Sequence, residues 1–323
     1  MEAIPRLQDV SHRPLQKKLV VLTAGFVLAV FAAEVAYRVV RVSNLGPTTN
    51  PAYVGYNEDL GWSYRPGARE RHQSPEFDVQ ININSRGFRG AEWPAREEGR
   101  KRVLILGDSL AFGWGVSEDA TFAARMAELE PTWDVLNAAV SGFGTDQELL
   151  LLQVLREELE PDLVICLFCS NDLFECAGAV SYGRYKPYFE LEGEGLVLRG
   201  SPVPRPIPQR VSQLWRAVVK HRWDLEHVNR SAGPTRGWRT VEALFVAMKD
   251  ELGDVPLLIL SERNQLIDLA RRSDLEHLDI RPALLGLGAG ARFPVDGHFT
   301  EDGHRAIADV AHDRAVDLLN VDN

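Results

Sequence analysis

The sequence predicts an α/β protein, a three-layer α/β/α sandwich with a parallel sheet, preceded by one N-terminal transmembrane helix. Short, continuously apolar runs recur along the chain, as expected of strands that are buried on both faces of a parallel sheet. Segments with helical spacing alternate with these runs, which is the pattern of α/β folds. A separate apolar stretch near the N-terminus is about as long as a bilayer core is thick.

The composition is that of a folded chain and not of a disordered, fibrous or polytopic membrane protein. The 323 residues are 45% hydrophobic and 25% charged, which is ordinary for a protein with a buried core. The formal net charge is −10, so we expect no binding to nucleic acid through its phosphates. The cysteines all fall within residues 166–176 and predict neither a disulfide framework nor a zinc site.

The N-terminal segment is expected to anchor the chain in a membrane. Residues 19–40 are apolar except for Glu34 and Arg38, which lie on one helical face and can pair. Basic residues are concentrated before this span, which favours a cytoplasmic tail over residues 1–18 and an extracytoplasmic body, periplasmic in a Gram-negative cell. A signal peptide cleaved near residues 30–32 and a buried core helix are the alternatives.

Residues 41–100 form a juxtamembrane lead-in that we expect to contain one strand. Residues 42–67 are rich in Gly, Pro, Asn and Tyr and have no helical period, so a surface linker is predicted there. Residues 77–84 (FDVQININ) alternate apolar and polar side chains, which indicates a half-buried strand. The turn-rich sequence SRGFRG follows at residues 85–90.

The main domain is expected over residues 101–320. Its strands are predicted from four apolar runs, at residues 102–106, 134–140, 162–169 and 255–260. Helical spacing covers residues 121–129, and a further helix opens at Thr145, where Glu148 three residues on would complete a capping box.

Residues 177–236 interrupt the alternation and are interpreted as an insertion at the carboxyl edge of the sheet, where α/β folds bind ligands. Two short apolar stretches flank the sequence Gly-Glu-Gly at residues 193–195, which predicts a β-hairpin. A proline-rich stretch and a helix with Trp215 and Trp223 should follow, either as part of a substrate lid or as structural padding.

A candidate nucleophile follows the first strand directly, in the sequence Gly-Asp-Ser-Leu at residues 107–110. A serine on such a turn can expose its hydroxyl, but it needs a base to become a nucleophile. Near the C-terminus, Asp296 stands two residues before His298, so the carboxylate can orient the imidazole while its other nitrogen faces Ser109.

Acyl transfer also needs hydrogen-bond donors for the negative oxygen that develops at the carbonyl. Residues 141–144 (SGFG) and 170–172 (SND) follow the second and third strands. The Gly142 N–H and the Asn171 side-chain amide would therefore meet Ser109 at one edge of the sheet. Gly142 as a simple turn glycine is the alternative.

These blocks resemble the SGNH/GDSL hydrolase superfamily, and in particular its membrane-anchored bacterial esterases. The resemblance runs from about Lys101 to Ala315 without the insertion, and three upstream blocks resemble the lead-in of anchored members, at residues 60–62, 65–67 and 84–90. It implies an SGNH/flavodoxin-like sandwich. The residues that it assigns are Ser109, His298 and Asp296 as the catalytic triad, and Ser109, Gly142 and Asn171 as the oxyanion hole.

The chain departs from the family pattern in two places. Cys169 stands where the family usually has the glycine of Gly-x-Asn-Asp, and the last block is Asp-x-His instead of Asp-x-x-His.

The other residues whose side chains could carry out chemistry are expected to have structural roles. Asp108 is expected to hold the turn. His304 repeats the Asp-Gly-His triplet of residues 296–298 but falls inside a predicted helix, so it should cap or pack. Cys166 and Cys169 are three apart on a strand and should point to opposite faces, which favours core packing over redox chemistry. Asp296 and His298 alone are too few ligands for a metal site.

The function implied is a serine esterase that hydrolyses carboxylic esters of short acyl groups, such as O-acetyl, without a metal or organic cofactor. The implied partners are an ester substrate, with an acylated cell-surface glycan suggested by anchored members, and the membrane through residues 19–40. An O-acyltransferase with the same triad and an inactive glycan-binding or assembly protein remain the alternatives.

Overall fold

The computed structural model describes residues 13–45, 51–176, 178–182, 184–193, 195–203 and 234–320. The chain divides into an N-terminal unit and a main body, and each is described by itself. The predicted proline-rich stretch and the helix with Trp215 and Trp223 lie outside the described residues.

The N-terminal unit is represented by one helix, α1 (Arg13–Leu45). Its segment Lys17–Tyr37 has a mean hydropathy of 2.4 and is long and apolar enough to cross a membrane. This confirms a helix over the predicted span and makes it a candidate membrane helix. A signal sequence near the N-terminus meets the same criteria.

The main body is built on a five-stranded sheet with the order β13-β12-β7-β5-β6, in which every neighbouring pair is parallel. The strands are β5 (Lys101–Gly107), β6 (Trp133–Asn137), β7 (Leu163–Leu167), β12 (Leu257–Ser261) and β13 (Glu276–Asp279). The four predicted strands are confirmed. The edge strand β13 was missed because its sequence, EHLD, is short and mostly charged.

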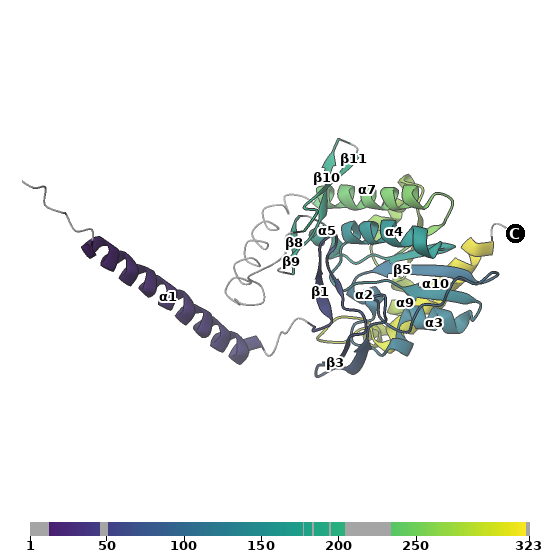
Figure 1. Cartoon of the computed structure of the whole chain (residues 1–323). Coiled ribbons are helices and arrows are strands. Elements are labelled where there is room, and N and C mark those ends of the chain that lie inside the picture. Colours follow the sequence, from purple (N-terminus) through teal and green to yellow (C-terminus); the bar gives the residue numbers. More distant parts are fainter. Residues whose placement is uncertain are drawn as a thin grey trace, which may run out of the picture. The chain divides into compact units, whose positions relative to one another are not determined.

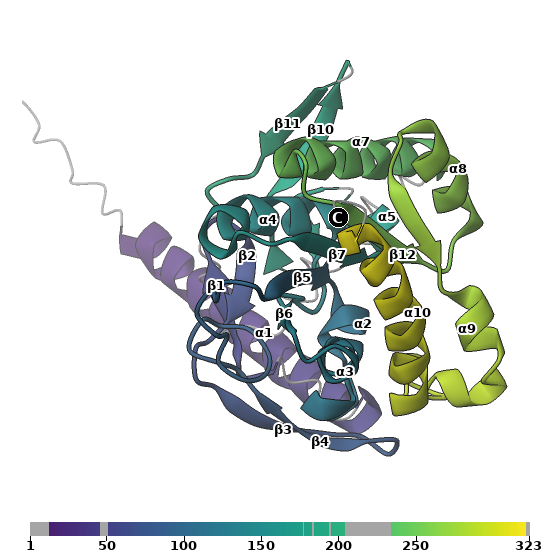
Figure 2. The same cartoon turned by 90° about the vertical axis from the view of Figure 1, so that its right-hand side faces the viewer.

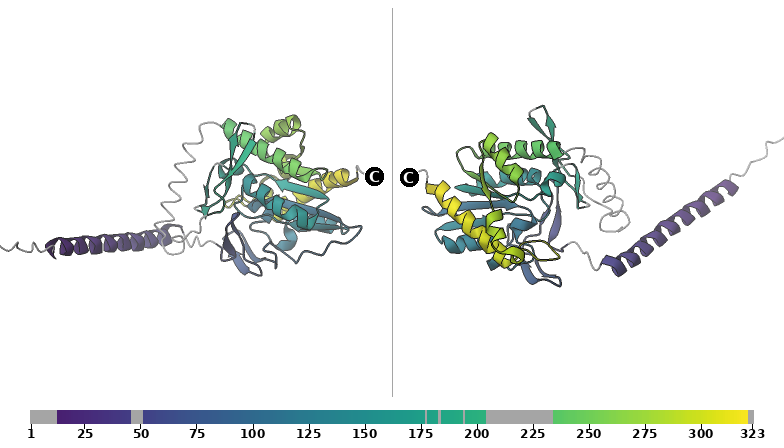
Figure 3. Two further views of the ribbon diagram at one scale, coloured as in Figure 1. Left: turned by 45° about the horizontal axis from the view of Figure 1, so that its top comes forward. Right: turned by 180° about the vertical axis from the view of Figure 1, so that it is seen from behind.

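Helices cover both faces of this sheet, as Figures 1 and 2 show. The helices α4 (Thr145–Leu159) and α7 (Pro234–Leu252) pack together on one face. The other face carries α3 (Phe122–Leu129) and α10 (Glu301–Asn320), and α10 is seen along this face in Figure 3. The sheet lies between them, and residues 103–106 of β5 are fully buried. The predicted three-layer sandwich is therefore confirmed.

The predicted capping box at the start of α4 is wrong. Thr145 is the first residue of the helix and Gly144 is its N-cap, with the Gly144 N–H donating to Gln147 Oε1 at 3.4 Å. The Thr145 hydroxyl instead donates to Asp172 Oδ2 at 3.2 Å, and the buried Glu148 accepts from Cys166 of β7 at 3.2 Å.

The lead-in contains four strands where one was predicted, paired as the antiparallel hairpins β1–β2 and β3–β4. They are β1 (Val54–Asn57), β2 (Gly61–Tyr64), β3 (Arg69–Gln73) and β4 (Asp78–Asn82). The surface linker predicted for residues 42–67 is wrong over its described part, because Tyr53, Trp62 and Tyr64 are all buried in the core.

The insertion begins with two small hairpins. They consist of β8 (Val180–Ser181) with β9 (Arg184–Tyr185), and β10 (Tyr188–Glu192) with β11 (Gly195–Arg199). The second is the predicted hairpin, and it stands out from the body in Figure 2. After β9, the fully buried Lys186 forms an ion pair with Asp146 at the start of α4. This buried ion pair fastens the insertion to the body.

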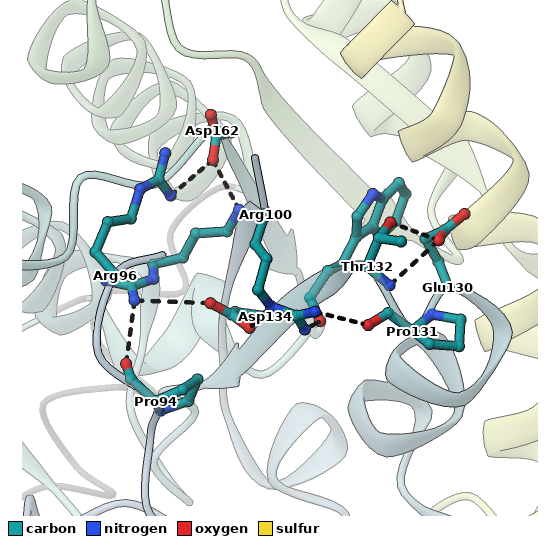
Figure 4. A network of polar contacts seen from close by, with 10 residues as sticks. Pro94, Arg96, Arg100, Glu130, Pro131, Thr132, Asp134 and Asp162 are labelled. Atoms are coloured by element: carbon teal, nitrogen blue, oxygen red, sulfur yellow. Dashed lines mark hydrogen bonds and ion pairs between the residues drawn. The ribbon is translucent and has the colours of Figure 1, made fainter. Parts of the chain in front are cut away.

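A polar network closes the amino end of the sheet (Figure 4). Arg96 donates to Asp162 at 2.8 Å, and Arg100 donates to Asp134 at 2.7 Å. The Arg102 backbone N–H also donates to Asp162, at 2.7 Å. These contacts join the end of the lead-in to β6 and to the residue before β7. The polar side chains at this end of the sheet therefore have structural roles.

A second arginine contact holds the short helix α2 (Ser109–Phe112), which follows β5. The Arg89 side chain is buried and donates to the carbonyl oxygens of Phe112, Gly113 and Val116, at 2.9, 2.5 and 2.6 Å. A cation at a helix C-terminus satisfies carbonyls that have no partner inside the helix. The motif SRGFRG thus supports the helix that begins at Ser109.

We therefore expect Arg89→Met to lower the free energy of unfolding by about 2–4 kcal/mol, because three buried carbonyls lose their donor. Thermal unfolding of the full-length chain in mild detergent, followed by near-UV circular dichroism, measures this. The matched control is Arg86→Met, since Arg86 is exposed and its ion pair with Glu158 should contribute no more than about 1 kcal/mol. Equal losses in both variants would contradict the role of Arg89.

Candidate active site

Ser109 lies at the carboxyl end of the inner strand β5, on a turn whose backbone at residue 107 requires glycine. Gly107 has a φ of +147°, and a Cβ there would come within 2.6 Å of the Ala111 side chain. Asp108 caps α2, since its Oδ1 accepts the Leu110 N–H at 2.8 Å. Asp108 thus holds the turn, as predicted, and the Ser109 side chain lines a pocket.

The structure brings Ser109, His298 and Asp296 into one hydrogen-bonded chain. His298 Nε2 lies 2.8 Å from Ser109 Oγ, and His298 Nδ1 lies 2.5 Å from Asp296 Oδ1. The carboxylate must accept from a protonated Nδ1, which leaves the Nε2 lone pair facing the serine hydroxyl. This is the arrangement in which a histidine can take the proton of an attacking serine.

The loop that carries Asp296 and His298 is fastened by the lead-in. The Glu76 carboxylate, in the turn between β3 and β4, accepts the backbone N–H groups of Val295 and Asp296 at 2.9 and 2.7 Å. Beside it, Phe77 packs against Phe293 with ring centroids 5.4 Å apart. The lead-in therefore sets the position of Asp296.

The lead-in also holds the turn around Gly142, after β6. The Tyr64 hydroxyl accepts the Ser141 N–H at 2.6 Å, and Trp62 Nε1 donates to the Ser141 carbonyl at 3.2 Å. Gly142 has a φ of +79°, and a Cβ there would come within 3.0 Å of the Tyr182 ring. Gly142 lies behind this ring and is not among the residues that line the pocket.

The backbone N–H of Ser109 donates to no other described backbone group and lies at the pocket, so it can face a ligand. The Gly142 N–H also has no described backbone acceptor, but Gly142 lies behind the Tyr182 ring. The Asn171 amide, in contrast, is engaged. Its Nδ2 lies 3.1 Å from Asp108 Oδ2 and 2.9 Å from Glu175 Oε1. Asn171 can therefore serve an oxyanion only by giving up one of these bonds.

A cluster of buried carboxyl groups lies beside Asn171. Its members are Asp108, Asp146, Glu148, Asp172 and Glu175. Burial is the main cause that raises the pKa of each carboxyl, and for Glu148, Asp172 and Glu175 the neighbouring carboxylates raise it further. Burial and then Asp108 raise the pKa of Glu175 to about 8. Glu175 is thus held mainly in its neutral form at neutral pH.

A pocket of about 630 Å³ opens beside Asp108 and Ser109. It is lined by Ser109, Asn171, Asp296 and His298, and also by Tyr182 of the insertion and three arginines, Arg263, Arg281 and Arg292. Ser109, Asn171, Arg263 and Arg281 all follow the carboxyl ends of sheet strands, which is where α/β folds bind ligands.

Sequence reasoning missed Glu76, Tyr182 and the arginines. Polar residues directly follow the predicted strand at residues 255–260. Because functional side chains gather at the carboxyl ends of such strands, which is the rule that indicated Ser109, this could also have indicated Arg263. Glu76 gave no such signal, because its partners are 219 and 220 positions away in the sequence.

The predicted packing of His304 is confirmed, whereas the placement of Cys169 on the strand is wrong, because β7 ends at Leu167. His304 is buried in α10, where its Nδ1 accepts the Phe122 N–H at 3.2 Å. Cys166 is buried in β7 and donates to Glu148 Oε2 at 3.2 Å, whereas Cys169 lines the pocket. No group of three or more His, Cys, Asp or Glu side chains among the described residues could hold a metal ion.

The comparison with protein families decides the class of this chain. Residues 105–306, more than half of the chain, match the GDSL-like lipase/acylhydrolase family. The chain belongs to this family. It is accordingly a hydrolase of ester bonds, and the matched region contains the serine, asparagine and histidine blocks described above.

Solved structures of GDSL and carbohydrate esterases resemble the main body at low sequence identity. TesA is 15% identical, with 68% of this chain and 98% of that chain covered and a TM-score of 0.40. A family 3 carbohydrate esterase of Clostridium thermocellum is 12% identical, with 68% and 97% covered and a TM-score of 0.42. The acetylxylan esterase Axe2 of Geobacillus stearothermophilus is 14% identical, with 70% and 97% covered and a TM-score of 0.38. The comparison with curated proteins found no match.

Glu76→Gln is expected to lower kcat for ester hydrolysis about tenfold, because an amide NH₂ would replace one of the acceptors for the Val295 and Asp296 N–H groups and misplace the triad loop. Initial rates on a chromogenic acetyl ester measure this. The matched control is Asp78→Asn on the same hairpin, where the exposed partner is Arg71, and its rate should stay within about twofold. Equal rates in the two variants would contradict the role of Glu76.

The raised pKa of Glu175 predicts a pH-dependent stability. Between its ordinary pKa of 4.5 and about 8, the folded chain keeps a proton that the unfolded chain has released, so stability falls as the pH rises. One such group contributes at most about 1.4 kcal/mol per pH unit.

Glu175→Gln should therefore lose less stability than the parent chain over this pH interval, as measured by urea midpoints of the full-length chain in mild detergent. The matched control Glu157→Gln removes an exposed carboxyl from α4 and should follow the parent chain. A parent-like pH profile for Glu175→Gln would contradict the burial of a protonated Glu175.

Proposed function

We propose that this protein is a serine esterase in which Ser109 attacks the ester carbonyl, His298 acts as general base and Asp296 orients His298. The observation that carries the proposal is the unbroken chain of hydrogen bonds from Asp296 through His298 to Ser109, at 2.5 and 2.8 Å. As the serine oxygen bonds to the carbonyl carbon, its proton passes to His298 Nε2, and the Asp296 carboxylate stabilises the imidazolium that forms.

The tetrahedral intermediate would place its negative oxygen against the backbone N–H groups of Ser109 and Gly142 and an N–H of the Asn171 amide. The Ser109 N–H lies at the pocket, the Gly142 N–H would become accessible when the Tyr182 ring beside it shifts, and Asn171 would exchange its bond to Glu175 for one to the oxyanion. His298 then returns its proton to the leaving alcohol. Water, activated by the same histidine, releases the acid from Ser109.

The proposed substrates are esters of short acyl groups such as acetyl, on glycans or small molecules. The choice of a glycan rests on the sequence resemblance to membrane-anchored esterases and is an analogy. The proposed location is a single-pass membrane anchor formed by α1 with the main body on the extracytoplasmic side. The apolar segment Lys17–Tyr37 and the basic residues before it support this orientation.

Ser109→Ala and His298→Ala are each expected to lower kcat/KM for a chromogenic acetyl ester by at least about a thousandfold, because either change breaks the unit that generates the nucleophile. The full-length chain in mild detergent should be assayed, with near-UV circular dichroism to verify folding. The matched control is Ser170→Ala, a second serine that lines the same pocket, and it should keep most of the activity. Hydrolysis that survives in folded Ser109→Ala would refute the mechanism.

A further inference from the structure

Arginine side chains gather around the pocket in an otherwise acidic chain of net charge −10. Arg263 is the second residue after β12, and Arg281 is the second residue after β13. Arg292 comes from the loop that leads to Asp296 and His298. All three line the same pocket as Ser109, together with the acidic residues Asp108, Glu262 and Asp296.

Two of these arginines have their charge compensated. Arg281 donates to both carboxylate oxygens of Asp279, at 2.8 and 2.5 Å. Arg292 forms an ion pair with Glu262 and donates to the Gly297 carbonyl at 2.6 Å. The guanidinium of Arg263 has neither a hydrogen bond nor an ion pair with any of the residues that the structure describes. Its backbone is bonded, with the N–H donating to Ser261 Oγ at 3.3 Å and the carbonyl accepting the Leu266 N–H at 3.0 Å.

The position of Arg263 is unfavourable for the helix that follows it. Arg263 is the N-cap of α8 (Asn264–Arg272) and makes no side-chain capping bond. Ser, Thr, Asn or Asp would cap the helix better, and a positive charge is repelled by the positive end of the helix dipole. A residue that weakens its local structure while facing a binding pocket is typical of a functional role.

We propose that Arg263 binds an anionic group of the substrate, a carboxylate or a phosphate monoester, while the ester carbonyl lies at Ser109. The proposal rests on the esterase function proposed above and adds a substrate class to it. The planar guanidinium presents parallel N–H groups that match two oxygens of either anion. Because Arg281 and Arg292 are already paired, Arg263 supplies the free charge of the pocket wall.

The test compares acetyl esters that differ in charge but share a phenyl ring, namely para-acetoxybenzoate, para-acetoxyphenyl phosphate and the neutral para-acetoxybenzamide. For each ester, kcat/KM of Arg263→Gln is divided by that of the parent full-length chain, which cancels intrinsic reactivity. We expect a loss of about threefold to tenfold for at least one anionic ester, mainly in KM, and a ratio near one for the neutral ester. The loss should shrink at high salt.

The matched control is Arg271→Gln. Arg271 lies on the same helix, is exposed, faces Asp268 at 3.5 Å and does not line the pocket, so its ratio should be near one for every ester. Arg263→Asn provides a second variant that should fold at least as stably as the parent, because asparagine is a better N-cap. It should show the same selective loss.

The outcomes separate the two proposals. A loss confined to the benzoate assigns the site to carboxylates, and a loss confined to the phosphate ester assigns it to phosphate monoesters. Equal losses on charged and neutral esters, or no loss on either anion, would overturn the anion site while leaving the esterase intact. A folded parent chain that hydrolyses none of the three esters would overturn the proposed esterase function itself.

Discussion

The hydrogen bond between Ser109 and His298 joins residues that are 189 positions apart in the sequence, and the site depends on how both ends are held. Ser109 is fixed from within the sheet, by the carboxyl end of β5 and the glycine turn that follows it. His298 lies on a loop outside the sheet, and the Glu76 carboxylate fixes that loop through the N–H groups of Val295 and Asp296. The lead-in is therefore part of the site's framework and not merely a linker.

Side chains of the lead-in form hydrogen bonds with three different parts of the site. Arg89 satisfies the carbonyls at the end of α2, Tyr64 and Trp62 hold the turn before Gly142, and Glu76 holds the triad loop. Beneath them lies a cluster of buried carboxyl groups whose desolvation costs stability. Such a cluster is tolerated because protonation and hydrogen bonds to Asn171 and Lys186 relieve part of the repulsion.

Sequence reasoning predicted the elements whose signal is local. Four sheet strands are continuous apolar runs, and the residues Ser109, Asn171, Asp296 and His298 follow strands or precede a helix in recognisable blocks. It failed where a signal was short or distant. β13 is a charged edge strand of four residues. The hairpin at residues 54–64 looks like a linker because its strands are only four residues long and contain glycine and polar residues beside the buried Trp62 and Tyr64. The contacts of Glu76 and the position of Tyr182 over Gly142 depend on tertiary structure alone.

The central claim, that the assembled triad makes Ser109 the nucleophile, is tested most directly by covalent labelling. An alkyl fluorophosphonate reacts with a serine that a neighbouring histidine activates, and peptide mapping by mass spectrometry locates the adduct. In the folded full-length chain we predict a single adduct on Ser109, and none in the heat-denatured chain, where the triad is dispersed. An adduct on another serine such as Ser170, or an unmodified Ser109 in the folded chain, would contradict the account.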